Sequence, residues 1–514
     1  MISINDDSGA CTKVRKIIAY DADPEMLFSR LRDLPDAIFL DSSLVNDTLG
    51  KYSIILVDPF AELTIKGKHA FFQRFSPTPS DGVKKHRPGS RYPFESATFE
   101  VIDDPLGVVE AMMEYFHMPE ANGATCSGHR SGEVPDDSEP LPCEDGCAAG
   151  FLSYDLGFSI EKIRERGYPA CGIPTVQLGL YDTAVVTDHA KRVTYLCVAE
   201  CPNGRANDFV SERVTDLLMR IQSKTEPAET KTTRFSCGPA KSDFSAERYR
   251  SAVRAAKEHI YNGDIYQVNL SQCFEGRFSG DPYCAYRALR KNGPAPFSAY
   301  MSLGPLQILS GSPERFFETD GRIIRTRPIK GTRPRGKSPE QDRAMLKDLL
   351  ESEKDRAELT MIVDLLRNDF GRFCRPGSVR VEKLFETEAY ENVYHQVATI
   401  CGECGDGVKI TDILRAVFPG GSITGAPKIR AMEIIDELES KKRGIYTGSL
   451  GYMGFNGRSD LNIAIRTLVC YADRFYYQVG GGIVWDSDPQ EEYEETMHKG
   501  RAIEKTLNSF RVDR

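Results

Sequence analysis

The hydrophobic positions of this chain follow the two periods of regular secondary structure in alternation. Runs rich in β-branched and aromatic residues, at 52–57 and 193–198, have the composition of buried strands. Residues 245–262 instead carry apolar side chains at helical spacing, and Gly263 ends this segment. Strand-like and helix-like segments alternate along most of the sequence, so the pattern predicts mixed α and β structure.

Two polar segments interrupt this pattern and indicate how the chain is organised. Residues 119–147 are rich in Gly, Pro, Ser, Asp and Glu and lack periodicity, which predicts a mobile surface insertion. A second polar stretch, 223–242, predicts a connection between two parts. We therefore expect an N-terminal region over residues 1–235 and a second region over residues 244–514.

The second region alternates strands, glycine turns and helices. Its pattern predicts helices at 339–369, 428–438 and 491–507, and strands at 266–270, 323–325 and 462–469. Three glycines, at 480–482, interrupt a further strand-like run. Glycines in such a context usually mark a bulge or the close approach of a ligand to the backbone.

Composition narrows the classes of partner. The chain carries a net charge of −9, which disfavours nucleic-acid binding, because that affinity rests on clustered Lys and Arg. No stretch approaches the roughly 18 apolar residues of a membrane span, and the first residues lack the apolar segment of a signal peptide. Fourteen scattered cysteines suit reduced thiols, so we expect a cytoplasmic protein that binds small molecules or other proteins.

Two predicted helices carry carboxylates three residues apart, a spacing that places both on one helix face. Asp355 and Glu358 form the first pair, and Glu492 and Glu495 form the second. Two facing pairs can hold Mg²⁺, a hard ion that takes oxygen ligands. Spacing leaves open whether the pairs face each other, and the first pair could equally bond to neighbouring basic residues on its own helix.

Other residues are candidates for binding an anion. The loop at 419–427 leads into the predicted helix 428–438, and free N–H groups at the start of a helix attract carboxylate or phosphate. Arg466 can grip a carboxylate with its planar guanidinium. Tyr446 and His395 stand among apolar neighbours and are either ligand-binding groups or satisfied core residues.

One motif points to a different class of protein. Residues 331–338 match the phosphate-loop expression G-x-x-x-x-G-K-[ST], which suggests a nucleotide hydrolase centred on Lys337. Such a loop points successive N–H groups at phosphates, and Pro334 removes one of these donors. Cys126 stands in a stretch like the elbow of a glutaminase, but no His-x-Glu follows to complete a triad.

Lys330 lies in Pro328-Ile329-Lys330-Gly331-Thr332, between a strand-like run and a glycine turn, where a lysine can act as an amine nucleophile. The other motifs, in chain order, are 263–270, 312–316, 361–369, 393–395, 420–428 and the helix of Glu495. Together they resemble the chorismate-utilising enzymes from about residue 245 to residue 510. The resemblance implies an α/β fold, a two-lobed sandwich of antiparallel sheets with flanking helices.

The resemblance also implies an activity. Anthranilate synthases typically carry alanine at the place of Lys330, and isochorismate synthases typically carry lysine at the place of Gln267. The pair Gln267 and Lys330 therefore favours conversion of chorismate and ammonia to 4-amino-4-deoxychorismate, a step toward 4-aminobenzoate and folate. Anthranilate synthesis is the alternative, and phosphate-loop hydrolysis is a remote one.

Residue roles follow from the same resemblance. Lys330 would add to C2 of chorismate in its uncharged form, favoured by desolvation or by cationic neighbours such as Arg333, and Glu314 would act as general acid and base. Leu359 departs from the pattern, since relatives often show a polar His or Asn there. The residues expected to bind substrate are Gln267, Thr332, His395, Thr424, Gly425, Tyr446, Arg466, Gly481, Gly482 and Lys499.

The resemblance further implies a metal and partners. Glu358 and Glu495 would bind Mg²⁺ directly, and Asp355 and Glu492 directly or through water. A separate glutamine amidotransferase subunit would supply ammonia in a heterodimer. In the N-terminal region, Leu40-Asp41-Ser42 is similar to the stretch that binds tryptophan in relatives, which makes Asp41 and Ser42 candidates for a tryptophan site.

Overall fold

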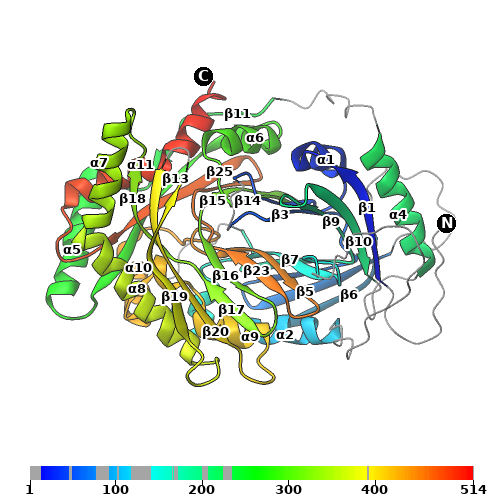
Figure 1. Ribbon diagram of the computed structural model, residues 1–514, viewed down its shortest axis with the longest axis horizontal. Helices are drawn as coiled ribbons and strands as arrows, with labels where there is room; N and C mark the ends of the chain where they lie inside the picture. The colour runs from blue at the N-terminus through cyan, green and yellow to red at the C-terminus, as the bar shows by residue number, and fades with distance from the viewer. Residues whose placement is uncertain are drawn as a thin grey trace.

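Two large sheets, in which neighbouring strands run antiparallel, form the frame of the molecule (Figure 1). The computed structural model describes residues 13–44, 49–76, 92–100, 104–116, 140–164, 166, 172–199, 207–223, 234–390 and 393–512. Apolar side chains from both sheets pack together between them. The predicted sandwich of antiparallel sheets with flanking helices is thereby confirmed.

The first sheet extends from β1 at one edge to β11 at the other, with β12 and β21 paired beside β13. Its strands in spatial order are β1 (Lys13–Tyr20), β10 (Val193–Ala199), β9 (Thr183–Asp188), β3 (Tyr52–Leu56), β2 (Ile38–Asp41), β14 (Phe297–Leu303), β15 (Leu306–Ser312), β24 (Thr467–Tyr471), β25 (Arg474–Ile483), β13 (Gln267–Ser279) and β11 (Ser236–Cys237), with β12 (Lys241–Ser242) and β21 (Gly425–Ala426).

The second sheet extends from β18 to β6, with β19 paired beside β20. Its strands in spatial order are β18 (Ile329–Pro334), β20 (Val393–Glu403), β17 (Ile323–Thr326), β16 (Arg315–Thr319), β23 (Ser459–Asn462), β22 (Ser449–Gly454), β7 (Cys147–Leu152), β8 (Val176–Tyr181), β4 (Ala61–Lys66), β5 (His69–Ser76) and β6 (Tyr92–Glu100), with β19 (Arg380–Ala389).

Helices cover the outer faces of both sheets (Figure 1). None of those in the described ranges is long and apolar enough to cross a membrane. The helices are α1 (Pro24–Leu31), α2 (Pro105–Tyr115), α3 (Leu156–Ile160), α4 (Asn207–Gln222), α5 (Ala246–Tyr261), α6 (Pro282–Asn292), α7 (Pro339–Glu351), α8 (Glu353–Gly371), α9 (Ile410–Val417), η1 (Gly421–Ile423), α10 (Lys428–Leu438) and α11 (Pro489–Asn508).

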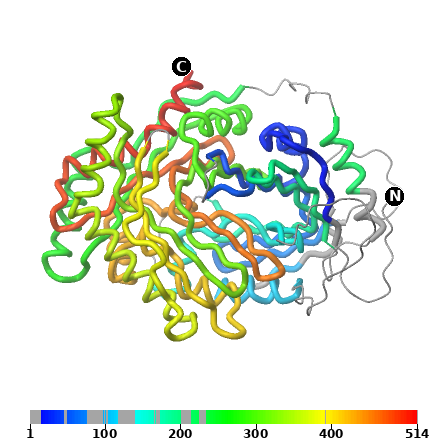
Figure 2. Tube along the Cα trace, viewed as in Figure 1, coloured from blue at the N-terminus to red at the C-terminus, as the bar shows by residue number. Residues whose placement is uncertain are grey.

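Both regions of the chain contribute strands to each sheet (Figure 2). In the first sheet β2 of the N-terminal region pairs with β14, and in the second sheet β7 pairs with β22. The expected division near residues 235–244 therefore separates the chain in sequence, while the apolar core between the sheets is common to both parts.

Two predictions about individual segments are wrong. The expected helix 339–369 is two helices, because Ser352 ends α7 and caps α8 by accepting a hydrogen bond from the backbone N–H of Asp355. The expected mobile insertion 119–147 is wrong for residues 140–147, since Leu141 and Cys147 are buried in the core between the sheets. Residues 117–139, with Cys126, lie outside the described part of the chain.

Two of the places where the chain crosses between the sheets lie against each other. Glu314 follows β15 of the first sheet and precedes β16 of the second, whereas Arg466 follows β23 of the second sheet and precedes β24 of the first. The N–H of Ile463 donates to the carbonyl of Glu314 at 3.0 Å, and the N–H of Gly311 donates to the carbonyl of Arg466 at 3.1 Å. We call these paired segments, 311–315 and 463–466, the seam.

A buried ion pair links α8 to α10. Lys428 Nζ lies 2.9 Å from Asp369 Oδ2 and also donates to the carbonyl of Val417 at 3.0 Å. Burial raises the pKa of Asp369, and the ammonium of Lys428 opposes that rise. Both charges are almost fully buried, so each depends on the other for compensation.

We predict that Lys428→Met destabilises the protein strongly, because it leaves the Asp369 carboxylate buried without its cation. The expected loss in the free energy of unfolding is about 3 kcal/mol. Urea denaturation would measure it, with Asp369→Asn combined with Lys428→Met as the matched control. The double variant should recover part of the loss, and a single variant as stable as the native chain would contradict the prediction.

Candidate active site

Lys330 lies within strand β18, and not in a turn as predicted. It stands directly opposite Gln396 of β20, and Gly331 is the extra residue of a bulge next to it. Gly331 has φ +76°, and a side chain there would lie 2.9 Å from Leu349 Cδ1, so the position requires glycine. Lys330 Nζ donates to the backbone carbonyl of Ser422 at 3.4 Å, which places the amine against the loop before α10.

Glu314 approaches the same serine from the seam. Its Oε1 accepts a hydrogen bond from Ser422 Oγ at 2.8 Å, and its side chain is buried. Burial raises the pKa of Glu314, opposed by the Ser422 hydroxyl and the charge of Lys330. Ser422 therefore joins a carboxyl group whose raised pKa favours the protonated form to a lysine amine, an arrangement that suits a general acid beside a nucleophile.

The two predicted acid pairs do lie on helices, and their charges interact. Asp355 and Glu358 stand on α8, and Glu492 and Glu495 stand on α11. Burial raises the pKa of Glu358, and the negative charges of Asp355 and Glu495 raise it further. Because Glu358 and Glu495 belong to different helices, this repulsion shows that the pairs approach each other across the site.

The second pair lies over the glycines of β25. A side chain at Gly481 would lie 3.0 Å from Glu492 Oε2 and 3.6 Å from Glu495 Oε1. Burial raises the pKa of Glu492, although Ser487 Oγ donates to its Oε1 at 2.6 Å. Burial also acts on Glu495, but Lys499, whose Nζ lies 2.6 Å away, and other lysines lower its pKa overall.

The carboxylates fit a hard cation with one exception. Glu492 Oε2 is buried and has no hydrogen-bond partner among the described residues, and the repulsion between Glu492 and Glu495 is what a divalent cation relieves. Asp355 instead pairs with Arg333 at 3.0 Å. Within the described ranges, no three Asp, Glu, His or Cys side chains converge closely enough to hold a metal as they stand.

Arg333 does not act as an uncompensated cation beside Lys330. Its guanidinium pairs with both Asp348 and Asp355. The charges that act on Lys330 are instead the carboxylates of Glu314, Glu358 and Glu495. The expected influence of Arg333 on the lysine amine is therefore largely cancelled by its two partners.

Arg466 is the free cation of the seam. It lies in the connection between β23 and β24 with φ +50°, and not within a strand as predicted. Burial lowers its pKa, and no ion pair holds its guanidinium among the residues described. Burial, followed by the charge of Arg466, lowers the pKa of His395 to about 3, so this imidazole is neutral at physiological pH.

The remaining candidates fall into two groups. His395 and Thr332 form a hydrogen bond, with His395 Nδ1 and Thr332 Oγ1 2.8 Å apart. Gln267 is fully buried, and neither atom of its amide has a hydrogen-bond partner among the described residues. Thr424 and Lys499 are already engaged, since Thr424 Oγ1 donates to the carbonyl of Gly420 and Lys499 Nζ to that of Gly480.

Glycine is required at two of the predicted positions. A side chain at Gly482 would lie 2.6 Å from Gln267 Nε2, and one at Gly425 would lie 2.2 Å from the Gln267 carbonyl oxygen. Tyr446 is buried, which raises its pKa, and it lines a cavity of about 400 Å³ with Tyr477 and Gln478.

Sequence reasoning missed Ser422 as the residue that joins Glu314 to Lys330. Its loop, 419–427, carried a signal for anion binding, but a serine within it carried none of its own. The contact between this loop and the seam forms only in the folded chain, so the sequence alone could not indicate the role of Ser422.

The phosphate-loop motif does not form an anion cradle. Asp342 of α7 accepts a hydrogen bond from the N–H of Gly336 at 2.9 Å and pairs with Arg335 at 2.8 Å, and Gln341 accepts from the N–H of Lys337. The donors that would face a phosphate are therefore occupied, and a carboxylate stands where the anion would bind.

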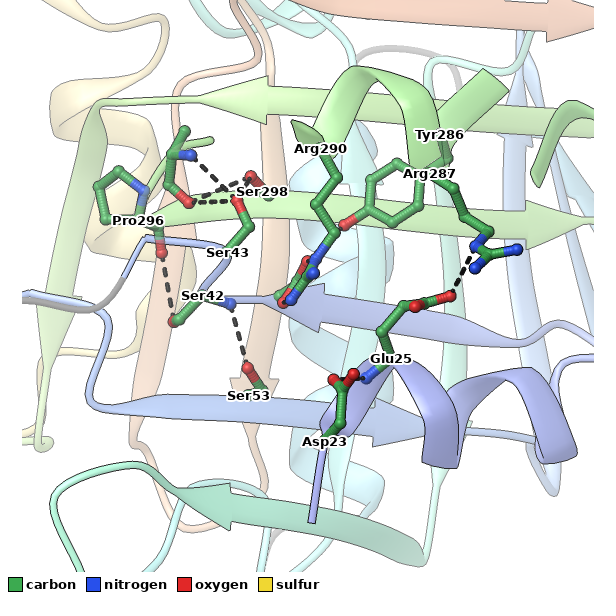
Figure 3. A network of polar contacts seen from close by, with 12 residues as sticks. Asp23, Glu25, Ser42, Ser43, Ser53, Tyr286, Arg287, Arg290, Pro296 and Ser298 are labelled. Atoms are coloured by element: carbon green, nitrogen blue, oxygen red, sulfur yellow. Dashed lines mark hydrogen bonds and ion pairs between the residues drawn. The ribbon is translucent and has the colours of Figure 1, made fainter. Parts of the chain in front are cut away.

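Asp41 and Ser42 lie at a separate cavity of about 370 Å³. Figure 3 shows a neighbouring polar network, in which Ser42 bonds to Ser53 and Pro296, and Tyr286 and Arg290 of α6 lie close together. Asp41 is buried and accepts from Tyr286 Oη at 3.0 Å and Arg290 Nε at 2.6 Å. Burial raises the pKa of Asp41 in spite of Arg290.

We predict that Glu314→Gln stabilises the fold while it removes activity. A pKa raised above the ordinary 4.5 means that the folded state loses relative stability as pH rises from that value. Glutamine keeps the acceptor for Ser422 and carries no charge, so the melting temperature at pH 8 should rise by about 1–2 °C. Thermal denaturation at pH 5 and pH 8 would measure this, and an equal or larger gain at pH 5 would contradict the assignment.

Comparison with known proteins agrees with this geometry. The chain is 37% identical over 483 residues to aminodeoxychorismate synthase component 1 of Escherichia coli (strain K12), covering 94% of this chain and 96% of that protein. It is 39% identical to anthranilate synthase component 1 of Aquifex aeolicus, covering 73% and 76%. The crystal structure of anthranilate synthase component I from Streptococcus pneumoniae superposes with a TM-score of 0.70 at 30% identity, covering 95% and 98%.

The family itself follows from the catalytic region. A model of the chorismate binding enzymes matches residues 110–505, a span that contains Lys330, the seam and both acid-bearing helices. The chain therefore belongs to the chorismate binding enzyme family.

Proposed function

We propose that this enzyme converts chorismate and ammonia into 4-amino-4-deoxychorismate, through a covalent adduct of Lys330. The observation that carries the proposal is the meeting of Lys330 and Glu314 at Ser422. One group is an amine able to form a bond to carbon, and the other is a carboxyl group whose pKa is raised by burial, which suits a general acid. Replacement of a hydroxyl group requires both.

The chemistry proceeds in two displacements. The uncharged Lys330 amine adds at C2 of chorismate while the C4 hydroxyl leaves as water with the proton of Glu314. Ammonia then adds at C4, the bond between Lys330 and C2 breaks so that Lys330 leaves as an amine, and the ring double bond returns to its first position. The ammonium formed at C4 returns a proton to Glu314. Two easier displacements replace one difficult direct displacement at C4, so the covalent route lowers the overall barrier.

The charged residues suit a substrate that carries carboxylates. Arg466 is half-buried and forms no ion pair among the described residues, and such a cation is well placed to receive a carboxylate. Glu358, Glu492 and Glu495 are the residues that would hold Mg²⁺, which would supply positive charge for a second carboxylate of the substrate. Asp355 would act through Arg333 and support the helix.

Amination at C4 is favoured over anthranilate formation by the presence of a lysine at position 330. Relatives named aminodeoxychorismate synthase component 1, from E. coli and from Bacillus subtilis, support this choice, while an anthranilate synthase component I also matches 95% of the chain. Lys330 itself supplies the covalent route to C4. The name component 1 denotes one part of an assembly, which supports a separate glutamine amidotransferase as the source of ammonia.

The cavity at Asp41 and Ser42 is proposed, on the resemblance alone, to receive tryptophan. Its volume of about 370 Å³ and its mixed polar and apolar lining suit an amino acid with a large side chain.

We predict that the protein with Mg²⁺, chorismate and ammonium chloride yields 4-amino-4-deoxychorismate, and that Lys330→Ala abolishes this product. A covalent adduct should appear in the intact mass of the native chain and be absent from Lys330→Ala. Lys337→Ala is the matched control, since its residue lies in the inactive phosphate-loop motif and should leave turnover unchanged. Anthranilate as the main product would transfer the assignment to the alternative reaction.

We predict that removing divalent cations with EDTA lowers turnover by about 100-fold or more, because unneutralised carboxylates then repel the substrate. Adding Mg²⁺ should restore the rate. In Glu492→Gln the concentration of Mg²⁺ for half-maximal rate should rise, measured by titration. Turnover that is insensitive to EDTA would refute a metal at these carboxylates.

A further inference from the structure

Gln396 is a buried amide that nothing described so far employs. It is fully buried in β20, and neither Oε1 nor Nε2 has a hydrogen-bond partner among the described residues. A buried amide without partners is costly, because it has given up its bonds to water. Its position must therefore be explained by a group that bonds to it when the enzyme works.

The strand register places Gln396 between two other polar side chains. It stands directly opposite Lys330 of β18 on one side and opposite Thr387 of β19 on the other. Residues directly opposite in an antiparallel pair project from the same face with Cβ atoms about 5 Å apart. Thr387 Oγ1 is likewise buried and without a partner in the described part of the chain.

This face of the sheet looks toward α8. Ala398, two residues beyond Gln396 and on the same face, packs in the core that contains Leu359 and Ile362 of α8. Strand β18 packs against α8, and the Lys330 amine donates to Ser422 of η1, which also packs against α8, so the amine lies on the α8 side as well. The amide and the amine therefore share the space between β20 and α8.

Neighbouring side chains of α8 do not satisfy the amide. Leu359, which stands where relatives often show a polar residue, is fully buried and apolar. Its side chain can offer Gln396 neither a donor nor an acceptor. The side chains directly opposite Gln396 in the two strand pairs do offer polar atoms, namely Lys330 Nζ and Thr387 Oγ1.

We propose that Gln396 is a positioning residue for Lys330, an inference that rests on the proposed function. Thr387 Oγ1 accepts from Gln396 Nε2, and Gln396 Oε1 accepts one N–H of the Lys330 amine. The carbonyl of Ser422 accepts a second N–H, at 3.4 Å in the structure. With both N–H bonds directed at fixed acceptors, the lone pair of the uncharged amine points away from them, toward the substrate.

The first test measures the reactivity of Lys330 without any substrate. Trace acetylation with acetic anhydride, followed by peptide mass spectrometry, gives the rate at Lys330 relative to the exposed Lys347 in the same sample. Gln396→Leu should change this ratio by about three- to tenfold, the usual effect of one hydrogen bond. Gln307→Leu, the same substitution at a surface site, should leave the ratio unchanged.

The second test separates positioning from binding. In Gln396→Leu the kcat for ammonia-dependent turnover should fall by about tenfold with an unchanged KM for chorismate. Thr387→Val, which keeps the shape of the side chain, should reproduce part of the loss in kcat and serves as the variant of choice if Gln396→Leu does not fold.

Two results would overturn the inference. An acetylation ratio equal to that of the native chain in both Gln396→Leu and Thr387→Val would do so, as would a loss of activity carried by KM alone. These tests also distinguish failure of the inference from failure of the proposed function. If the native enzyme did not convert chorismate, the acetylation rates would still test the contact between Gln396 and Lys330.

Discussion

A carboxyl group removed from water next to a lysine amine is the constraint on which the site depends. Glu314 is buried, and burial disfavours its ionised form even though Lys330 and Ser422 stand beside it. Burial also raises the pKa of Glu358 and that of Glu492, and the negative charge of Glu495 raises both further. The site therefore stores unfavourable negative charge that a cation or a proton relieves, a pattern typical of active sites.

Such a site needs a frame that prevents its groups from relaxing into solvent or into ordinary ion pairs. The seam provides this frame, because Glu314 and Arg466 sit on two crossovers bonded to each other through their backbones. Each crossover is anchored at both ends in a different sheet. Neither residue can shift without disturbing two strands, which explains how an acid and an unpaired guanidinium stay close without forming a salt bridge.

The sequence predicted elements well where periodicity decides the structure. Helices α5, α10 and α11 match the predicted segments within a few residues, as do strands β3 and β10. Errors arose where a single residue overrides periodicity. Ser352 caps a new helix inside an unbroken helical pattern, and Lys330 belongs to a strand because bulged Gly331 lets β18 continue past it.

The candidate site was only partly accessible to sequence reasoning, for a related reason. The acid pairs of α8 and α11 follow from spacing along one helix, but their mutual repulsion depends on the relative placement of two helices far apart in sequence. Asp355 looked equivalent to Glu358, yet its partner Arg333 comes from β18. No sequence motif singles out Ser422 or Gln396. Their proposed roles depend on the residues that lie next to them in the folded chain.

The electrostatic arrangement also bears on the choice between ammonia and water as the incoming nucleophile. Water needs a base to remove its proton, whereas uncharged ammonia needs none. Gln267, buried beside Gly482, is an amide that cannot accept a proton at neutral pH. Burial raises the pKa of Glu314, which suits it to donate a proton before it accepts one. In the proposed reaction, the amide of Gln267 and the acid of Glu314 therefore suit a nucleophile that needs no base.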